Sequence, residues 1–303
     1  MHFGLELLTP GGRSSNKPLL VQVPKKQMET SVKPNTKIRV KRTLDGHFKP
    51  TLTQEQQMKL LLEQADTTPH CVWGGRHPTQ EISKAQVTSL FIRKVNLLSK
   101  LKIHYRFSTN TFMLASALWD YFMKKVMVVV DHEDVKPINL DHFDALVAAS
   151  LFIAFKVVET SLPHLEGLKS FLHHKVEIST IIQAEQNILQ VLQFDISIVT
   201  AADVADKLCS FANATTGNQI YPIVKQSLEI SCCNQKFQAY SAADLATGAM
   251  LYAGWKQRIP DDELNFIPTF MRTTTAVQCK EDLFEFIMKE ITPILDGKVK
   301  SEG

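Results

Sequence analysis

The sequence predicts an all-α protein, with two tandem five-helix bundles preceded by a disordered basic tail and an N-terminal helix. Apolar residues recur at spacings of three and four through most of the chain after residue 52, and no convincing strand-like alternation lies between them. The stretch LFIAFK at residues 151–156 has a counterpart, LYAGWK, at residues 251–256. A chain of 303 residues is also long enough for two domains that each bury a core.

Residues 1–52 are the predicted disordered basic tail. They contain five prolines and show no sustained apolar period. Residues 1–60 carry 11 Lys and Arg against four Asp and Glu, a net charge of +7, whereas the whole chain has a net charge of +3. A basic arm is thus joined to a body with a net charge of −4. The segment KIRVKR at residues 37–42 favours a nuclear-import patch or a plain solvated tail.

Residues 53–82 are predicted to form the N-terminal helix and a loop. The segment TQEQQMKLLLEQAD consists mainly of strong helix formers and places Met58, Leu61 and Leu62 on one stripe. The segment that follows, TTPHCVWGGRHPTQ, has the prolines and glycines of a loop.

Residues 83–199 are predicted to form the first bundle. Residues 145–155 are apolar or small on every side, which is typical of a central helix surrounded by others. Hydrophobic period and capping residues together predict five helices, beginning at or near Ser83, Ser108, Asp141, Pro163 and Glu177.

Residues 200–296 are predicted to repeat this plan as the second bundle, and residues 297–303 to form a short tail. Both closing helices carry the same apolar spacing: Ile188, Leu189 and Leu192 in the first, Leu283, Phe284 and Ile287 in the second. Central helices rich in small residues can resemble one another by composition alone. The shared order of the helices favours a true repeat.

Catalytic and metal-binding motifs are absent from the sequence. It contains no G-x-x-x-x-G-K-[ST], no G-x-G-x-x-G and no G-x-S-x-G, and its cysteines and histidines do not have the spacing of a zinc site. We therefore expect that the protein is not an enzyme, that it has no catalytic or metal-binding residues, and that it needs no cofactor.

The cellular context is predicted from the cysteines and from the hydropathy. No stretch is apolar over the roughly 20 residues that a membrane-spanning helix needs. The five cysteines, with Cys232 and Cys233 adjacent, do not form a disulfide framework. We expect a nuclear and/or cytoplasmic protein without a membrane partner.

Two charged residues occupy positions where the helical pattern asks for apolar ones. Lys156 interrupts the predicted central helix, and Glu185 lies on the apolar stripe of the closing helix. Because burial of either charge alone is costly, the two residues are predicted to pair at the rim of the first bundle. The second repeat keeps Lys256 but has Lys280 in place of the glutamate. The pair is therefore either an ordinary salt bridge or a binding feature that the fold itself does not need.

Three segments, in order, resemble the cyclin box. They are residues 105–123 (YRFSTNTFMLASALWDYFM), residues 148–159 (AASLFIAFKVVE) and residues 185–195 (EQNILQVLQFD). The resemblance covers about residues 85–200 well and the second half more loosely.

The resemblance implies a regulatory subunit that binds and activates a cyclin-dependent protein kinase. Lys156 and Glu185 match the signature lysine and glutamate that meet the kinase, and Leu189 and Phe194 match apolar positions of the same contact surface. A cyclin docks against the mobile helix of the kinase small lobe and helps to order the activation loop.

Two other functions are compatible with the same fold: a transcription adaptor bound to nucleic acid, and a scaffold that binds partners without activating a kinase. A DNA-bound core should have a basic face, whereas residues 61–303 sum to a charge of −4. Contact with nucleic acid is therefore expected only through the basic tail, if at all.

Overall fold

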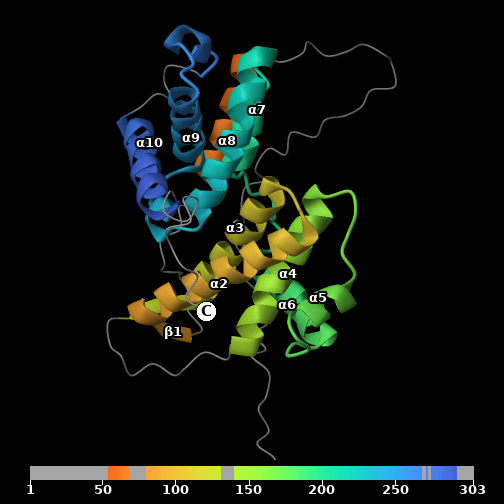
Figure 1. Cartoon of the computed structure of the whole chain (residues 1–303). Helices are drawn as coiled ribbons and strands as arrows, with labels where there is room; N and C mark the ends of the chain where they lie inside the picture. The colour runs from red at the N-terminus through yellow and green to blue at the C-terminus, as the bar shows by residue number, and fades with distance from the viewer. Residues whose placement is uncertain (1–53, 68–79, 131–139, 268–270, 272–273, 292–303) are drawn as a thin grey trace, which may run out of the picture. The chain divides into compact units, whose positions relative to one another are not determined.

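The computed structural model describes residues 54–67, 80–130, 140–267, 271 and 274–291 (Figure 1). The predicted basic tail, the C-terminal tail and most of the loop after the first helix lie outside the described residues. Within the described part the chain is all-α, as predicted, with ten α-helices. None of the described helices has the length and hydropathy needed to cross a membrane.

The first bundle consists of five helices, as predicted. The separate N-terminal helix α1 precedes it at Gln54–Thr67. The five helices are α2 (Lys84–Tyr105), α3 (Thr109–Val126), α4 (Leu140–Val158), α5 (Leu165–Phe171) and α6 (Ile178–Val191).

The second bundle repeats this order with a shorter fourth member. Its helices are α7 (Ala201–Cys209), α8 (Ala214–Cys232), α9 (Ala242–Lys256) and α10 (Thr274–Phe286), with a 3₁₀ turn η1 (Gln235–Ala239) after α8, a 3₁₀ turn η2 (Asp261–Leu264) and a terminal π turn η4 (Ile287–Ile291). The turn η2 stands between α9 and α10, where the short helix α5 stands between α4 and α6.

Side-chain caps set the starts of five of these helices. Ser83 and Gln86 form a capping box at the start of α2, and Ser108 accepts a hydrogen bond from the Thr111 amide at the start of α3, which confirms the predicted cap. In the second bundle Thr200, Asn213 and Ser241 cap α7, α8 and α9 in the same way.

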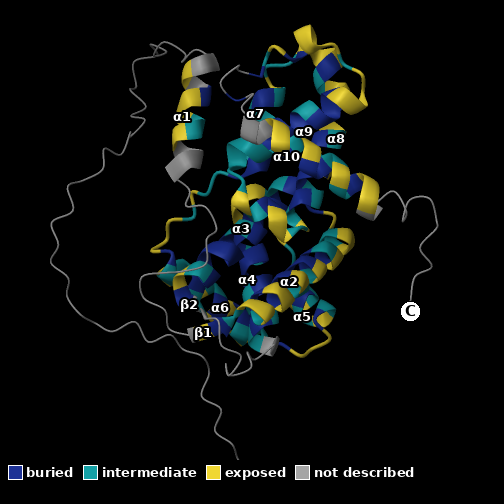
Figure 2. Cartoon of the chain, turned by 90° about the vertical axis from the view of Figure 1, so that its left-hand side faces the viewer, coloured by how far each residue is buried: buried dark blue, intermediate teal, exposed yellow. Residues whose placement is uncertain are grey.

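The core of the first bundle is built around α4. Ala145, Ala148, Ala149 and Leu151 are buried there, and Figure 2 shows α4 buried along most of its length. Small residues allow α2, α3 and α6 to pack closely around this helix. The predicted central helix is confirmed.

One feature departs from a purely helical pattern: a two-stranded parallel pair. Strand β1 (Gln80–Ser83) pairs with β2 (Met127–Val130), and Ile82 lies opposite Val129. The sequence of β2 is MVVV, which suits a strand, but four residues are too short to show a period. The pair ties the start of α2 to the end of α3.

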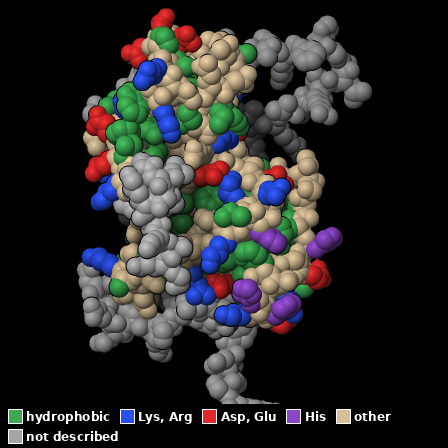
Figure 3. Space-filling view, viewed as in Figure 1, with side chains coloured by type: hydrophobic (Ala, Val, Ile, Leu, Met, Phe, Trp, Pro, Cys, Tyr) green, Lys and Arg blue, Asp and Glu red, His purple; other side chains and the backbone are tan. Residues whose placement is uncertain are grey.

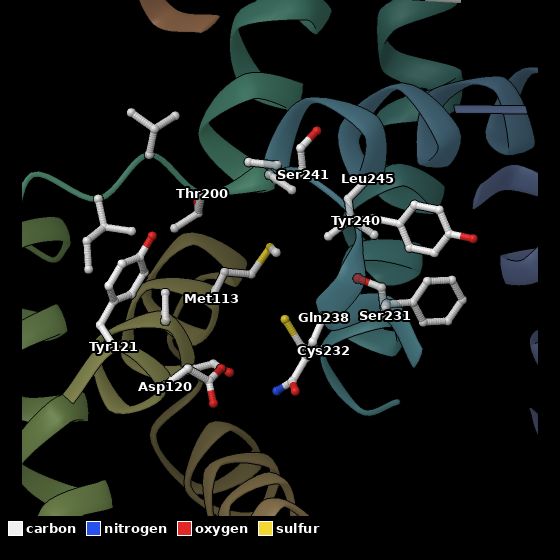
Figure 4. Close-up of a pocket in the computed structure, with 17 residues that line it drawn as sticks. Met113, Asp120, Tyr121, Thr200, Ser231, Cys232, Gln238, Tyr240, Ser241 and Leu245 are labelled. Carbon is white, nitrogen blue, oxygen red and sulfur yellow. The ribbon is translucent and has the colours of Figure 1, made fainter. Parts of the chain in front are cut away.

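A small cavity of about 140 Å³ lies beside α3 and α8 (Figure 4). At its edge the fully buried ammonium of Lys94 donates to both carboxylate oxygens of Asp120, at 2.8 and 2.9 Å. Burial raises the pKa of Asp120, and the charge of Lys94 opposes this effect. Burial also raises the pKa of the Cys232 thiol to about 12, so this thiol stays neutral.

Candidate functional site

The structure brings Lys156 and Glu185 together. Lys156 lies in the last turn of α4 and Glu185 lies in the middle of α6. The Lys156 Nζ donates to the Glu185 Oε1 at 2.5 Å. The lysine side chain is 41% exposed and the glutamate side chain 13% exposed. The predicted pair at the rim of the bundle therefore exists.

The packing of α4 on α6 explains why this pair forms at an edge. Ile181, Ala184 and Ile188 are buried on the core side of α6, and Glu185 follows Ala184 at the border of that stripe. On α4, Lys156 follows the buried Phe155, so its side chain leaves the core and reaches along the surface. Its ammonium also lies 4.4 Å from the ring centroid of Phe152, which fixes its position further.

This ion pair contributes little to the stability of the fold. The pair is worth about 1 kcal/mol, because its lysine is 41% exposed to screening water and two side chains must be ordered, although the Glu185 side chain is only 13% exposed. The pair holds an ammonium and a carboxylate in a fixed place at the surface. Each group can form further hydrogen bonds to a partner.

A second carboxylate near the end of α4 has a structural task that the sequence did not reveal. Glu159 accepts hydrogen bonds from the Ser108 amide at 2.9 Å and from the Thr111 hydroxyl at 2.5 Å. Burial raises the pKa of Glu159, but these hydrogen bonds outweigh it and the pKa is lowered overall. Glu159 thus joins the end of α4 to the start of α3 and holds the helix that carries Lys156.

Phe194 is displayed to solvent by an unusual turn after α6. Gln193 and Phe194 both have left-handed backbone conformations, with φ of 56° and 58°. The Phe194 amide donates to the carbonyl of Leu189 at 2.7 Å, which closes the turn. The Phe194 side chain is 69% exposed. Such a conformation is uncommon for a bulky residue, so an exposed aromatic ring held this way points to a contact surface.

Leu189 and Ile182 extend the same surface. They lie four residues after and three residues before Glu185, which puts all three on one side of α6. Leu189 is half-buried against the core, and Ile182 is 39% exposed. We name this surface the α4–α6 face and define it by Lys156, Ile182, Glu185, Leu189 and Phe194. Sequence reasoning missed Ile182; its position one residue off the buried stripe was the available signal.

The corresponding helices of the second bundle, α9 and α10, lack this ion pair. Lys256 lies near the Tyr252 ring, with its Nζ 5.9 Å from the centroid, and the position that matches Glu185 is Lys280. Neither lysine is in an ion pair with another described residue. Trp255, the counterpart of Phe155, is 57% exposed and packs edge-to-face on Phe284 at 4.7 Å.

Known protein structures show where this fold has been seen. A viral cyclin from herpesvirus saimiri is similar over 75% of this chain and 96% of its own, with a TM-score of 0.59 and 14% sequence identity. A chain of the yeast RNA Pol II CTD kinase CTDK-1 complex is similar over 77% of this chain and 73% of its own, with a TM-score of 0.51 and 12% identity. At these identities the likeness is one of fold.

The sequence itself matches a protein family over the first bundle. Residues 76–197 match the model of the cyclin N-terminal domain. This span contains every residue of the α4–α6 face. The first bundle of this chain is therefore a match to the cyclin N-terminal domain.

Proposed function

We propose that this protein is a regulatory subunit that binds and activates a cyclin-dependent protein kinase through the α4–α6 face. The observation that carries the proposal is the Lys156–Glu185 pair, which is held at the surface and which the second bundle does without; Phe194 is exposed just after the helix that carries Glu185. A regulatory subunit of this kind contributes no chemistry of its own. We place the N-terminal cyclin box at residues 83–199 and the cyclin-like second domain at residues 200–296.

The α4–α6 face offers the two kinds of contact that a helix of the kinase requires. Leu189 and Phe194 offer apolar area for the helix side chains, and Lys156 and Glu185 offer a donor and an acceptor for backbone groups at its end. By holding the mobile helix in place, the subunit lets the Lys–Glu pair inside the kinase form and helps to order the activation loop. The kinase complex that contains the similar yeast chain supports this proposal.

The charge of the body argues for a protein partner. Residues 61–303 have a net charge of −4, which disfavours a nucleic-acid interface on the bundles. Contact with nucleic acid is proposed, if at all, only for the basic tail. A nuclear and/or cytoplasmic location is part of the same proposal, and the kinase that is captured would distinguish a role in the cell cycle from a role in transcription.

The proposal is tested by capture of the kinase with the full-length chain and by a kinase assay on the captured complex. Glu185→Lys copies the second bundle and should weaken the complex by about 30-fold or more, because it leaves Lys156 and the partner group without their carboxylate. The melting temperature should fall only slightly, since the Lys156 side chain is 41% exposed and water screens its charge. Gln183→Lys is the matched control. It adds a lysine to the same helix about 200° away around the axis and should bind like the wild type.

Three results would count against the proposal. Recovery of no cyclin-dependent kinase from native extract would favour the scaffold hypothesis, and so would a bound kinase whose activity does not rise. Unfolding of the Glu185→Lys variant would show that the pair is structural.

A further inference from the structure

The cavity of about 140 Å³ beside α3 and α8 lies between the two bundles. One wall comes from α3, and the other comes from the end of α8, the turn η1 and the start of α9. Ile198 and Val199, in the segment that joins the bundles, also line it. We name it the interbundle cavity and define it by Met113, Asp120, Val199, Cys232, Ala242 and Leu245. None of the residues of the α4–α6 face lines it.

Polar contacts between the bundles hold the two walls in place. The Thr109 hydroxyl at the start of α3 donates to Glu229 of α8, and Lys102 of α2 pairs with the same carboxylate at 2.8 Å. The side-chain amide of Asn110 donates to Asp206 of α7 at 2.9 Å. Figure 3 shows acidic and basic side chains gathered at the level where the two bundles meet. The interbundle cavity is therefore a built part of the fold.

Much of the cavity wall is apolar. Met113 and Ala117 line it from α3, and Phe237, Ala242 and Leu245 line it from the second bundle. Figure 4 shows Met113 and Leu245 on the two walls, which belong to different bundles. An apolar cavity of about 150 Å³ is large enough to bind benzene. The interbundle cavity therefore has room for a molecule with one six-membered ring.

The polar groups of the wall offer acceptors more than donors. The Lys94 ammonium uses its three protons on the two oxygens of Asp120 and on Ser116, the last at 3.0 Å. Each Asp120 oxygen keeps the capacity to accept a second hydrogen bond. Three hydroxyl groups of the wall already donate to neighbouring groups at 2.7 to 2.8 Å, namely those of Thr200, Ser231 and Ser241. A ligand in this cavity must therefore supply the hydrogen-bond donor.

The Lys94–Asp120 pair favours a donor without charge. The Lys94 side chain is 0% exposed and the Asp120 side chain 9% exposed, and their charges neutralise each other at 2.8 Å. A ligand ammonium would lose its water beside a second ammonium, whereas a hydroxyl group can donate to Asp120 without bringing a charge. The Cys232 thiol is neutral, so it does not act as a nucleophile toward the ligand.

We propose that the interbundle cavity binds a small neutral molecule with one apolar ring and one hydroxyl group, of the phenol class. The ring packs between Met113 and Leu245, and the hydroxyl group donates to Asp120. Because this ligand contacts both bundles, its binding stabilises their arrangement. The proposal does not depend on kinase binding, because the cavity and the α4–α6 face share no residue.

Isothermal titration calorimetry of the full-length chain with three probes tests the ligand class. The probes are p-cresol, toluene, which lacks the hydroxyl group, and benzylamine, which carries a positive charge at neutral pH. We expect p-cresol to bind with a Kd of about 1 mM or tighter and to raise the melting temperature. Toluene should bind about tenfold more weakly, because the hydrogen bond to Asp120 is missing. Benzylamine should bind about tenfold more weakly as well, because its charge meets Lys94.

Two leucine variants of α9 test the location. Ala242→Leu fills the cavity and should weaken p-cresol by about tenfold or more. Ala243→Leu is the matched control, because Ala243 is the next residue of the same helix, is also half-buried and does not line the cavity. It should bind p-cresol like the wild type. Ala117→Leu fills the cavity from α3 and replaces Ala242→Leu if circular dichroism shows that the latter is unfolded.

Each contrary result would overturn the proposal. Equal affinities for p-cresol and toluene would show that Asp120 does not accept a hydrogen bond from the ligand. Tighter binding of benzylamine would show that the cavity prefers a cation. An equal loss in Ala242→Leu and Ala243→Leu would place the bound p-cresol elsewhere. Binding of none of the three probes would mean that the cavity holds only water.

Discussion

The two bundles present the same pair of helices to solvent in different ways. In the first bundle, α4 ends with a buried Phe155 and a Lys156 that pairs with Glu185 of α6. In the second, α9 ends with an exposed Trp255 and with Lys256, and Lys280 of α10 takes the position of the glutamate. The first surface displays both an ammonium and a carboxylate, whereas the second displays an exposed aromatic ring and two lysines.

This difference distinguishes the features that both bundles share, which the fold requires, from the features that only one bundle has. Both bundles keep the central helix rich in small residues and the closing helix that packs on it. Among the described residues, only the first bundle has the ion pair. The second bundle keeps the helix order without the ion pair, so the fold does not require the pair. Binding to a partner therefore explains the pair more readily than folding does.

The largest expected effect concerns the two matched aromatic residues. Phe155→Ala should destabilise the protein by about 3–5 kcal/mol, because Phe155 is 4% exposed and packs edge-to-face on Phe107 at 5.2 Å. Trp255→Ala should cost about 1–2 kcal/mol, since 57% of this residue is already in water. Urea unfolding of both variants measures the difference. Equal losses would show that the burial of the two positions does not differ as described.

The sequence predicted the helical class, the repeat and the Lys156–Glu185 pair because each produces a pattern within a short stretch of residues. Periodicity marks the helices, and a charge that interrupts an apolar stripe marks the rim. It did not predict the strand pair β1–β2 or the 3₁₀ form of the turn η2, because each spans only four residues. Propensity over so few residues is outweighed by tertiary contacts.

Other structural features depend on contacts between residues that are far apart in the sequence, so no pattern in a short stretch of sequence predicts them. Glu159 caps a helix whose first residues lie about 50 positions earlier. Phe155 and Trp255 occupy matching positions in the sequence, but the first is 4% exposed and the second 57% exposed. The roles of Leu189 and Phe194 in kinase binding stay a prediction.

A smaller effect is expected at Gly254, which lies where the first bundle has Ala154. A Cβ at Gly254 would stand 2.6 Å from a methyl group of Leu264 in η2. Gly254→Ala should therefore cost about 1–3 kcal/mol through overpacking, despite the better helix propensity of alanine. Ala154→Gly, in the first bundle, should cost about 1 kcal/mol for the opposite reason, because it loosens a helix. Thermal melts compare the two; a stabilising Gly254→Ala would mean that Leu264 moves aside freely.

The smallest expected effect is the dependence of stability on pH through Glu159, and it concerns a device that both bundles share. Thr111 at the start of α3 donates to Glu159, and Thr216 at the start of α8 donates to Glu263, each at 2.5 Å. Because the pKa of Glu159 is lowered below 4.5 in the folded protein, its contribution is present at neutral pH and is lost as the pH falls through the folded value. Between pH 6 and pH 3.5 the melting temperature of Glu159→Gln should fall less than that of the wild type. Parallel curves would show that the carboxylate charge is not what holds α4 to α3. This cap recurs in both bundles, as a structural element should, whereas the Lys156–Glu185 pair does not.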